Sequence, residues 1–130
     1  IRVERVDRAY RRRPARFLQR IFTGKEREMI FKKANPAPSI AARFAAKEAV
    51  AKALGCGIGP VRWRELEILS GERGKPVVHL TGNAQRWAEK HGIAGVDVTI
   101  SHDGPYAVAA AIAYGYEATR VGLTEDDIFD

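Results

Sequence analysis

The chain has 130 residues, of which 45% are hydrophobic and 29% charged, and its formal net charge at pH 7 is +6. This length suits one domain with a hydrophobic core, and the composition excludes disordered and fibrous proteins. No run of about 18 apolar residues predicts a membrane span. No signal-peptide pattern opens the chain, and a single cysteine, Cys56, excludes an internal disulfide.

The positive charge is unevenly distributed along the chain. From Glu117 onward five acidic residues accompany one arginine, which gives this tail a charge of −4 and leaves +10 for the rest. Many of the basic residues lie early, at Arg8, Arg11, Arg12, Arg13, Arg16 and Arg20. A basic body attracts nucleic acid, phosphorylated cofactors or an acidic protein, although a solvated helix face is the simpler explanation.

The first half of the sequence predicts mainly helices. Residues 1–6 alternate like a strand, residues 8–13 predict a helical turn, and Pro14 limits any helix that spans it. A narrow apolar face predicts the next helix (Phe17, Leu18, Ile21 and Phe22). Thr23 and Glu26 form a capping-box pattern for a helix that ends near Lys33. After a proline-rich break, Ser39 is expected to cap a helix over residues 40–54 that Gly55 ends.

The second half predicts antiparallel strands around one helix. Residues 64–69 and 76–81 resemble two strands joined by a glycine-containing turn, and residues 84–91 predict a short amphipathic helix. Residues 96–101 and 106–113 predict a second pair of strands around the turn 102–105, the last one with a buried character. The expected fold class is α+β, with a domain over residues 1–116 and an acidic tail over residues 117–130.

One helical stripe carries the clearest chemical pattern. Phe44, Glu48 and Lys52 are four residues apart and therefore lie on the same side of the predicted helix. A surface ion pair between Glu48 and Lys52 is the simpler interpretation. The alternative is a phosphoryl-transfer site, because a carboxylate holds Mg²⁺ while an ammonium neutralises a phosphate.

The remaining candidates are weaker by themselves. Gly55, Gly57 and Gly59 follow the helix and either form a cap and loop or admit a ligand close to the backbone. His102 lies at the end of a strand, where a side chain points into a cleft or has only a structural part. Cys56 has no sequence neighbours that indicate a nucleophile or a zinc site.

Residues 43–59, RFAAKEAVAKALGCGIG, resemble the signature of the holo-acyl-carrier-protein synthase family, F-x-x-K-E-A-x-x-K-A-x-G. Three further stretches agree with the same family in order and spacing: RFLQRIFTGKE at 16–26, GKPVVHL at 74–80 and VTISHDGPYAVA at 98–109. The resemblance covers about residues 1–113. It implies the phosphopantetheinyl transferase fold, with N-terminal helices packed on a mainly antiparallel sheet.

The resemblance also implies an activity, which is the transfer of 4′-phosphopantetheine from coenzyme A to a serine of apo-acyl carrier protein in fatty acid or polyketide synthesis. Glu48 matches the metal ligand and Lys52 the lysine that stabilises the pyrophosphate. Coenzyme A would contact Arg43, Lys52, Gly55, Gly57 and His102. Arg5 matches the arginine that docks the acidic carrier, and Arg11, Arg12 and Arg13 widen that basic patch.

Two further expectations come from the family pattern. The second metal ligand is an aspartate that the pattern places two positions before Ile1, so it is absent from this sequence, which we expect to be incomplete at that end. Family members of this size are homotrimers with sites between chains. We therefore expect a cytoplasmic, Mg²⁺-dependent homotrimer that binds neither membranes nor nucleic acid.

Two alternatives compete with the transferase. A nucleic-acid-binding module explains the arginines, but it does not explain Glu48 with Lys52, and no known nucleic-acid motif is present. A non-catalytic subunit that binds the carrier protein would become attractive if the upstream aspartate were missing from the native protein.

Overall fold

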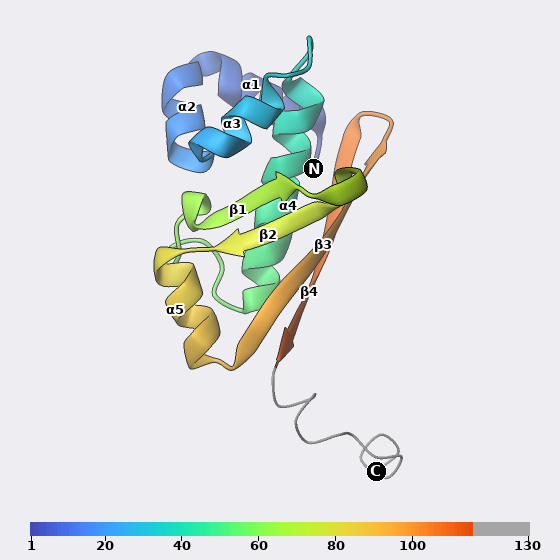
Figure 1. The fold of residues 1–130 in the computed structure, drawn as a ribbon. Coiled ribbons are helices and arrows are strands. Elements are labelled where there is room, and N and C mark those ends of the chain that lie inside the picture. Colours follow the sequence, from blue (N-terminus) through green and yellow to red (C-terminus); the bar gives the residue numbers. More distant parts are fainter. Residues whose placement is uncertain (116–130) are drawn as a thin grey trace.

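The computed structural model describes residues 1–115, so the tail expected at 117–130 lies outside the described residues. The fold is α+β, with helices first and antiparallel strands after them, as the sequence predicts (Figure 1). The helices are α1 (Val3–Arg12), α2 (Pro14–Ile21), α3 (Gly24–Ile30), α4 (Ala37–Leu54) and α5 (Gly82–Lys90). The strands are β1 (Leu66–Ser70), β2 (Pro76–Leu80), β3 (Ile93–Asp103) and β4 (Tyr106–Gly115), with short 3₁₀ turns η1 (Trp63–Glu65) and η2 (Glu72–Gly74).

The strand predicted for residues 1–6 is wrong beyond its first two residues. Ile1 and Ala107 exchange both backbone hydrogen bonds, at 2.7 and 2.8 Å, and α1 begins directly afterwards. Helix spacing prevails because Val3 and Val6 both pack against an apolar cluster that includes Phe22 and Ile40. Ion pairs between Glu4 and Arg8 and between Asp7 and Arg11 also bridge successive turns of the helix.

The start predicted for the longest helix is also wrong. α4 begins at Ala37, two residues before Ser39, and Ser39 is buried within it instead of capping it. Prolines are tolerated in the first turn of a helix, where the backbone N–H has no intrahelical partner, so Pro38 does not delay the start. The other end is as predicted, because Gly55 takes the left-handed conformation at φ 85°.

The capping box at α3 is confirmed. The Thr23 hydroxyl accepts from the Glu26 backbone N–H, and a Glu26 carboxylate oxygen accepts from the Thr23 backbone N–H at 3.0 Å. The helix ends at Ile30, a little earlier than the predicted end near Lys33.

The strands form two separate antiparallel hairpins. β1 pairs with β2 from Leu66↔Leu80 to Ser70↔Pro76, and β3 pairs with β4 from Ile93↔Gly115 to Asp103↔Tyr106. The longer β3–β4 hairpin runs beside α4, and the shorter β1–β2 hairpin crosses the same helix (Figure 1).

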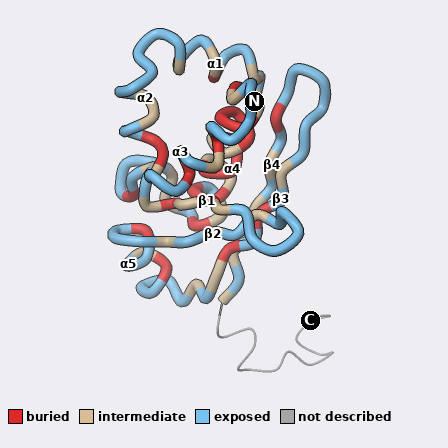
Figure 2. Tube along the Cα trace, turned by 45° about the horizontal axis from the view of Figure 1, so that its top comes forward, coloured by how far each residue is buried: buried red, intermediate tan, exposed pale blue. Residues whose placement is uncertain are grey.

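α4 is the centre of the core, and most of its residues are buried while the surrounding elements are exposed on their outer sides (Figure 2). One apolar cluster joins its C-terminal half to β1, α5 and β3, and a second joins its N-terminal half to α1, α2 and α3. Among the helices of residues 1–115, none is long and apolar enough to cross a bilayer.

The buried character predicted for the last strand holds for only one side of β4. Ala107 is fully buried, whereas Val108, Ile112 and Tyr114 on the other side are 49%, 71% and 50% exposed. This alternation has the period of a strand with only one side covered by the domain.

Candidate active site

The predicted stripe of α4 is its solvent-facing side. Phe44 and Glu48 are partly exposed and Lys52 is exposed, while most other residues of the helix are buried. The structure therefore places the Glu48 carboxylate and the Lys52 ammonium one turn apart on the accessible side of a rigid central helix. No ion pair joins them among the described residues, so both charges can face a ligand.

Glu48 lines a small cavity between α4 and the N-terminal helices. The cavity has a volume of about 270 Å³, and its walls include Ile1, Arg5, Phe17 and Phe44. Arg5 and Glu48 thus share one cavity, although they are 43 positions apart in the sequence. A carboxylate beside a guanidinium at an open cavity gives one ligand for a hard cation and one site for an anion.

Two larger clefts lie beside this cavity and share lining residues in sequence. Phe17 and Phe44 also line the next cleft, of about 610 Å³, and that cleft shares Arg20 and Trp63 with a third cleft of about 890 Å³. We call the three clefts together the arginine trough. The arginines along it are Arg5, Arg12, Arg13, Arg16, Arg20, Arg62, Arg64 and Arg86.

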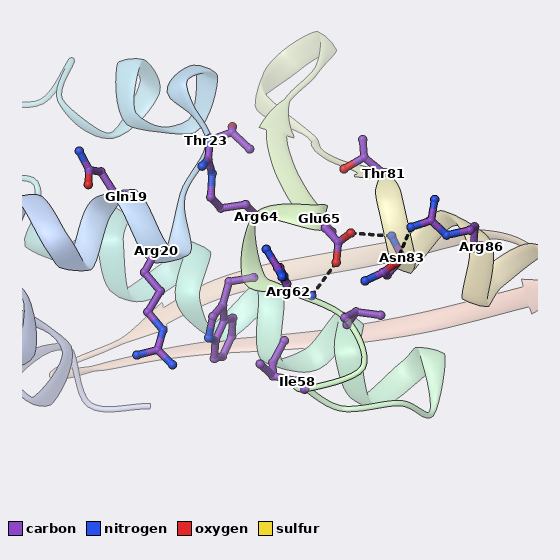
Figure 3. A pocket seen from close by; sticks show the side chains of 13 residues that line it. Gln19, Arg20, Thr23, Ile58, Arg62, Arg64, Glu65, Thr81, Asn83 and Arg86 are labelled. Carbon is purple, nitrogen blue, oxygen red and sulfur yellow. Dashed lines mark hydrogen bonds between the residues drawn. The ribbon is translucent and has the colours of Figure 1, made fainter.

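Aromatic rings form part of the wall of the trough. Phe44 and Trp63 stack with their ring centroids 4.9 Å apart and their planes at 28°. A stacked pair of this kind is rigid and apolar, so the trough combines an apolar surface with a charged rim. Figure 3 shows the third cleft, where arginine side chains from α2 and from the segment around η1 surround the opening.

A buried ion pair holds this wall in place from inside. Lys47 and Glu26 are both 0% exposed, and the Lys47 Nζ lies 2.8 Å from Glu26 Oε1. The same ammonium donates to the Trp63 carbonyl at 2.9 Å and to the Leu66 carbonyl at 2.6 Å. Burial lowers the pKa of Lys47, and the Glu26 carboxylate opposes that shift.

Arg43 lies on a different side of α4 from Glu48. Its guanidinium is 3.4 Å from both Met29 Sδ and Ser70 Oγ, so it points toward α3 and β1. Burial lowers the pKa of Arg43, with Glu26 opposing the shift. The structure does not bring Arg43 into the cavity of Glu48.

The glycine loop leaves open space at the end of α4. Gly55 and Gly57 have φ values of 85° and 66°, and a Cβ at either position would meet nothing within 4 Å. Glycine is therefore required by the backbone conformation. Cys56 between them is a free, partly buried thiol whose pKa is raised by burial, which makes it a poor nucleophile.

His102 lies at the opposite end of α4 from Lys52. It lines a cavity of about 540 Å³ with Asp7, Ala37 and Pro38. Ala37 opens α4, and Lys52 follows it by about 22 Å along the helix axis at 1.5 Å per residue. Within one chain, His102 and Lys52 therefore cannot contact the same small ligand group.

The four predicted docking arginines do not share one surface. Arg5, Arg12 and Arg13 line the trough. Arg11 instead pairs with Asp7 at 2.8 Å and lines a neighbouring cleft on α1, to which Arg12 also contributes. The sequence alone could not distinguish these arginines. The side of the molecule on which each one lies depends on how the helix is rotated against the core, which only the structure shows.

The described residues supply a single carboxylate to the Glu48 cavity, and they contain no group of three or more potential metal ligands. Mg²⁺ is usually held by one or two carboxylates together with substrate phosphates and water. Glu48 is compatible with that kind of site, since its carboxylate makes no ion pair among the described residues and can coordinate a cation.

Comparison with known proteins identifies the family. Residues 1–111 match the 4′-phosphopantetheinyl transferase superfamily. The chain belongs to this superfamily. A holo-[acyl-carrier-protein] synthase of Caldanaerobacter subterraneus subsp. tengcongensis is 48% identical over 115 residues, which cover 88% of this chain and 90% of that protein. A holo-[acyl-carrier-protein] synthase of Chlamydia caviae is 46% identical over 113 residues, 86% of this chain and 89% of that protein.

Solved structures of the superfamily share the fold. The Neisseria meningitidis holo-[acyl-carrier-protein] synthase superposes with a TM-score of 0.80 at 32% identity and covers 88% of this chain and 92% of its own. The Helicobacter pylori enzyme, solved in complex with coenzyme A, has a TM-score of 0.78 at 27% identity, with coverages of 88% and 95%. The family resemblance seen in the sequence is thereby confirmed.

Several residues of the site were not predicted. The sequence predicts only a helix cap for Glu26 and no role for Lys47, although Lys47 directly precedes Glu48. The available signal was Lys47 itself, a charged residue inside an alanine-rich helix. Such a residue is rarely buried without a partner, so a buried position would have indicated a counter-charge. Arg62, Arg64 and Arg86 gave no signal, since only the fold brings them beside Arg20.

Proposed function

We propose that this protein is a holo-acyl-carrier-protein synthase, which transfers 4′-phosphopantetheine from coenzyme A to a serine of apo-acyl carrier protein and releases 3′,5′-ADP. The observation that carries the proposal is the placement of Glu48 and Lys52, unpaired, on the accessible side of α4 in a member of the 4′-phosphopantetheinyl transferase superfamily. The carrier protein and coenzyme A are the two substrates.

The reaction is a phosphoryl-type transfer between oxygen atoms. The serine hydroxyl of the carrier attacks the β-phosphorus of coenzyme A, a new P–O bond forms, and the bond to the α-phosphate oxygen breaks. Glu48 accepts the serine proton through a bound water, and Lys52 neutralises the charge that develops on the departing 3′,5′-ADP. A fixed ammonium one turn from the carboxylate is well placed for this, because stabilisation of developing charge is the main contribution in such reactions.

Mg²⁺ is the proposed cofactor, with Glu48 as its ligand from the described chain. When bound, it would supply charge neutralisation for the pyrophosphate. The family pattern implies an aspartate as a second carboxylate ligand. For coenzyme A we propose contacts to Arg43, Gly55, Gly57 and His102 in addition to Lys52.

The trough supports an acidic partner. Arg5, Arg12 and Arg13 stand along its rim near Glu48, and an acidic carrier protein would be attracted to them. The aromatic wall made by Phe44 and Trp63 would contact apolar groups of the same partner.

A homotrimer with sites between chains is the proposed assembly. The separation of His102 from Lys52 in one chain supports it, because a neighbouring chain could bring its own His102 to the Lys52 end of α4. The apolar outer side of β4, with Ile112 71% exposed, is a surface that self-association would cover. We place the reaction in the cytoplasm, a reducing compartment that suits the free thiol of Cys56.

A direct assay tests the proposed function. The chain, extended at its N-terminus by its native upstream residues if the gene encodes them, is incubated with coenzyme A, Mg²⁺ and a bacterial apo-acyl carrier protein. Mass spectrometry should show the carrier gain one phosphopantetheine, and Glu48→Gln should abolish the gain while circular dichroism stays unchanged. Equal transfer by the wild type and Glu48→Gln would contradict the assigned site.

A further inference from the structure

The third cleft of the trough shares no lining residue with the cavity of Glu48 and is lined by arginines from three parts of the fold. Arg20 comes from α2, Arg62 and Arg64 flank Trp63 at η1, and Arg86 comes from α5. We call this cleft of about 890 Å³ the distal cleft. Figure 3 shows the four arginine side chains distributed around it.

The positive charge of the distal cleft is only partly compensated within the described residues. Arg20, Arg62 and Arg64 make no side-chain hydrogen bond or ion pair there, and Arg86 contacts only the Asn83 side-chain oxygen. Unpaired guanidinium groups keep their donors available, so they are able to bind carboxylates or phosphates in bidentate fashion.

The carboxylate of Glu65, which also lines the cleft, is engaged elsewhere. Its oxygens accept from the backbone N–H groups of Arg62 and Asn83, as the dashed lines in Figure 3 show. Gly82 at the start of α5 lies so close to this carboxylate that a Cβ there would collide with it. Glu65 therefore fixes the η1 segment to α5, and its single negative charge offsets only one of the four arginine charges of the cleft.

The wall between the distal cleft and the rest of the trough is rigid. Trp63 belongs to both clefts, stacks on Phe44, and has its carbonyl held by the buried Lys47 ammonium. Because Arg20 and Trp63 line both clefts, a large partner lying over the α1 arginines would lie next to the distal cleft. The rigid wall holds the arginines of the distal cleft at a fixed distance from Glu48. Such an arrangement suits a folded partner, whose own charges are also at fixed distances, better than a single small anion.

We propose that the distal cleft is a second anchor for the acyl carrier protein, and that it binds an acidic segment of the carrier away from the reacting serine. The inference rests on the proposed function and extends its docking surface from α1 to η1 and α5. The lining residues that the distal cleft shares with the neighbouring cleft, and its positive charge, together support this partner, because an acidic protein presents several carboxylates at separated points.

Arg62→Glu/Arg64→Glu tests the proposal, with Lys75→Glu/Lys90→Glu as the control of equal charge change. Lys75 and Lys90 are exposed and line none of the three clefts of the trough. The measurement is the Kd of a fluorescently labelled bacterial apo-acyl carrier protein by anisotropy without coenzyme A, at low and moderate salt. Steady-state transfer is measured beside it.

We expect the Kd to rise about tenfold in Arg62→Glu/Arg64→Glu and less than about twofold in the control. The salt dependence of binding should become shallower, because fewer charges contribute. The kcat at saturating carrier and the KM for coenzyme A should stay at wild-type values. If the charge reversal unfolds the protein, Arg62→Gln/Arg64→Gln replaces it in the same measurement, and we then expect a smaller rise in Kd.

Other outcomes would overturn the proposal in recognisable ways. Wild-type transfer and binding with no difference between the two variants would remove the distal cleft from the docking surface and leave the proposed function intact. Absence of both transfer and carrier binding in the wild type would overturn the proposed function as well. Loss of duplex DNA binding without a change in carrier Kd would assign the cleft to nucleic acid. If Arg62→Glu/Arg64→Glu no longer raises the carrier Kd in a protein that also carries Glu125→Gln/Asp126→Asn/Asp127→Asn, the distal cleft would be assigned to the chain's own tail and not to the carrier.

Discussion

Lys47 and Glu26 form an ion pair that is wholly inaccessible to solvent, with 2.8 Å between Nζ and Oε1. Every proton of the ammonium is used, since the Trp63 and Leu66 carbonyls accept the other two. Glu26 in turn accepts from the backbone N–H groups of Thr23 and Ile68. One pair of charges therefore joins α3, α4, η1 and β1 directly behind the solvent-facing Glu48.

Lys47→Met should lower the free energy of unfolding by about 3–5 kcal/mol, because it leaves a buried carboxylate without its counter-charge. Lys52→Met, on the exposed side of the same helix, should change it by less than about 0.5 kcal/mol and act on transfer instead. Urea denaturation followed by circular dichroism measures both. A Lys47→Met protein as stable as Lys52→Met would show that the pair is not important for folding.

Glu26→Gln should restore part of the stability lost in Lys47→Met. Glutamine keeps an oxygen for the Thr23 or Ile68 N–H and removes the uncompensated charge, so the double variant should unfold at a higher urea concentration than Lys47→Met alone. The same urea titration decides the matter. A further loss of stability in the double variant would mean that hydrogen bonding to Glu26 is more important than its charge.

The sequence predicted most of the elements because their local signals agree with the fold. The capping box at Thr23, the glycine after α4 and both strand pairs are found as predicted. The prediction from the sequence failed where a short pattern is compatible with both a strand and a helix. Six residues of alternation at Ile1 could not outweigh the helix spacing and ion pairs of α1, which continue beyond them.

The site was predictable only to the extent that it is local in the sequence. Glu48 and Lys52 lie one helical turn apart, so their placement follows from the helix alone. The Glu26–Lys47 pair joins residues 21 positions apart, and the distal cleft joins Arg20 to Arg86. Such contacts arise from tertiary packing, which a single sequence does not reveal.

Arg12→Glu/Arg13→Glu should raise the KM for the carrier protein far more than the KM for coenzyme A, because both residues stand on the rim of the trough. Arg8→Glu/Arg11→Glu, with the same change of charge, is the matched comparison, since both residues belong to α1 but line only the neighbouring cleft beside Asp7. It should change the carrier KM less than about threefold. Steady-state transfer with each substrate varied in turn measures this, and equal effects of both variants would contradict the orientation of α1.

Ile112→Asp should convert the proposed trimer into monomers and lower transfer with it. A carboxylate on the exposed apolar side of β4 would be buried without a partner in any assembly that covers this surface. Val77→Asp, at an apolar position that is 38% exposed on the other hairpin, is the control and should leave the assembly unchanged. Light scattering after size-exclusion chromatography gives the masses. An Ile112→Asp protein of wild-type mass would exclude this side of β4 from the interface.

The last prediction concerns the two ends of α4. His102 and Lys52 are separated by about the length of the helix in one chain, so both can contact the same phosphate group of coenzyme A only if they come from two chains. Glu48→Ala and His102→Ala should each be inactive. If each site takes Glu48 from one chain and His102 from its neighbour, chains of the two variants should complement each other when they are mixed unfolded and refolded together.

Random mixing in equal amounts gives each interface of a closed ring about a one-in-four chance of pairing an intact Glu48 with an intact His102. The mixture should therefore recover about one quarter of the wild-type transfer rate, whereas the two proteins refolded separately and then mixed should stay inactive. Native mass spectrometry confirms that mixed trimers have formed. Mixed trimers without recovered activity would place the whole site within one chain, and a wild-type protein that is monomeric by light scattering would exclude a shared site altogether.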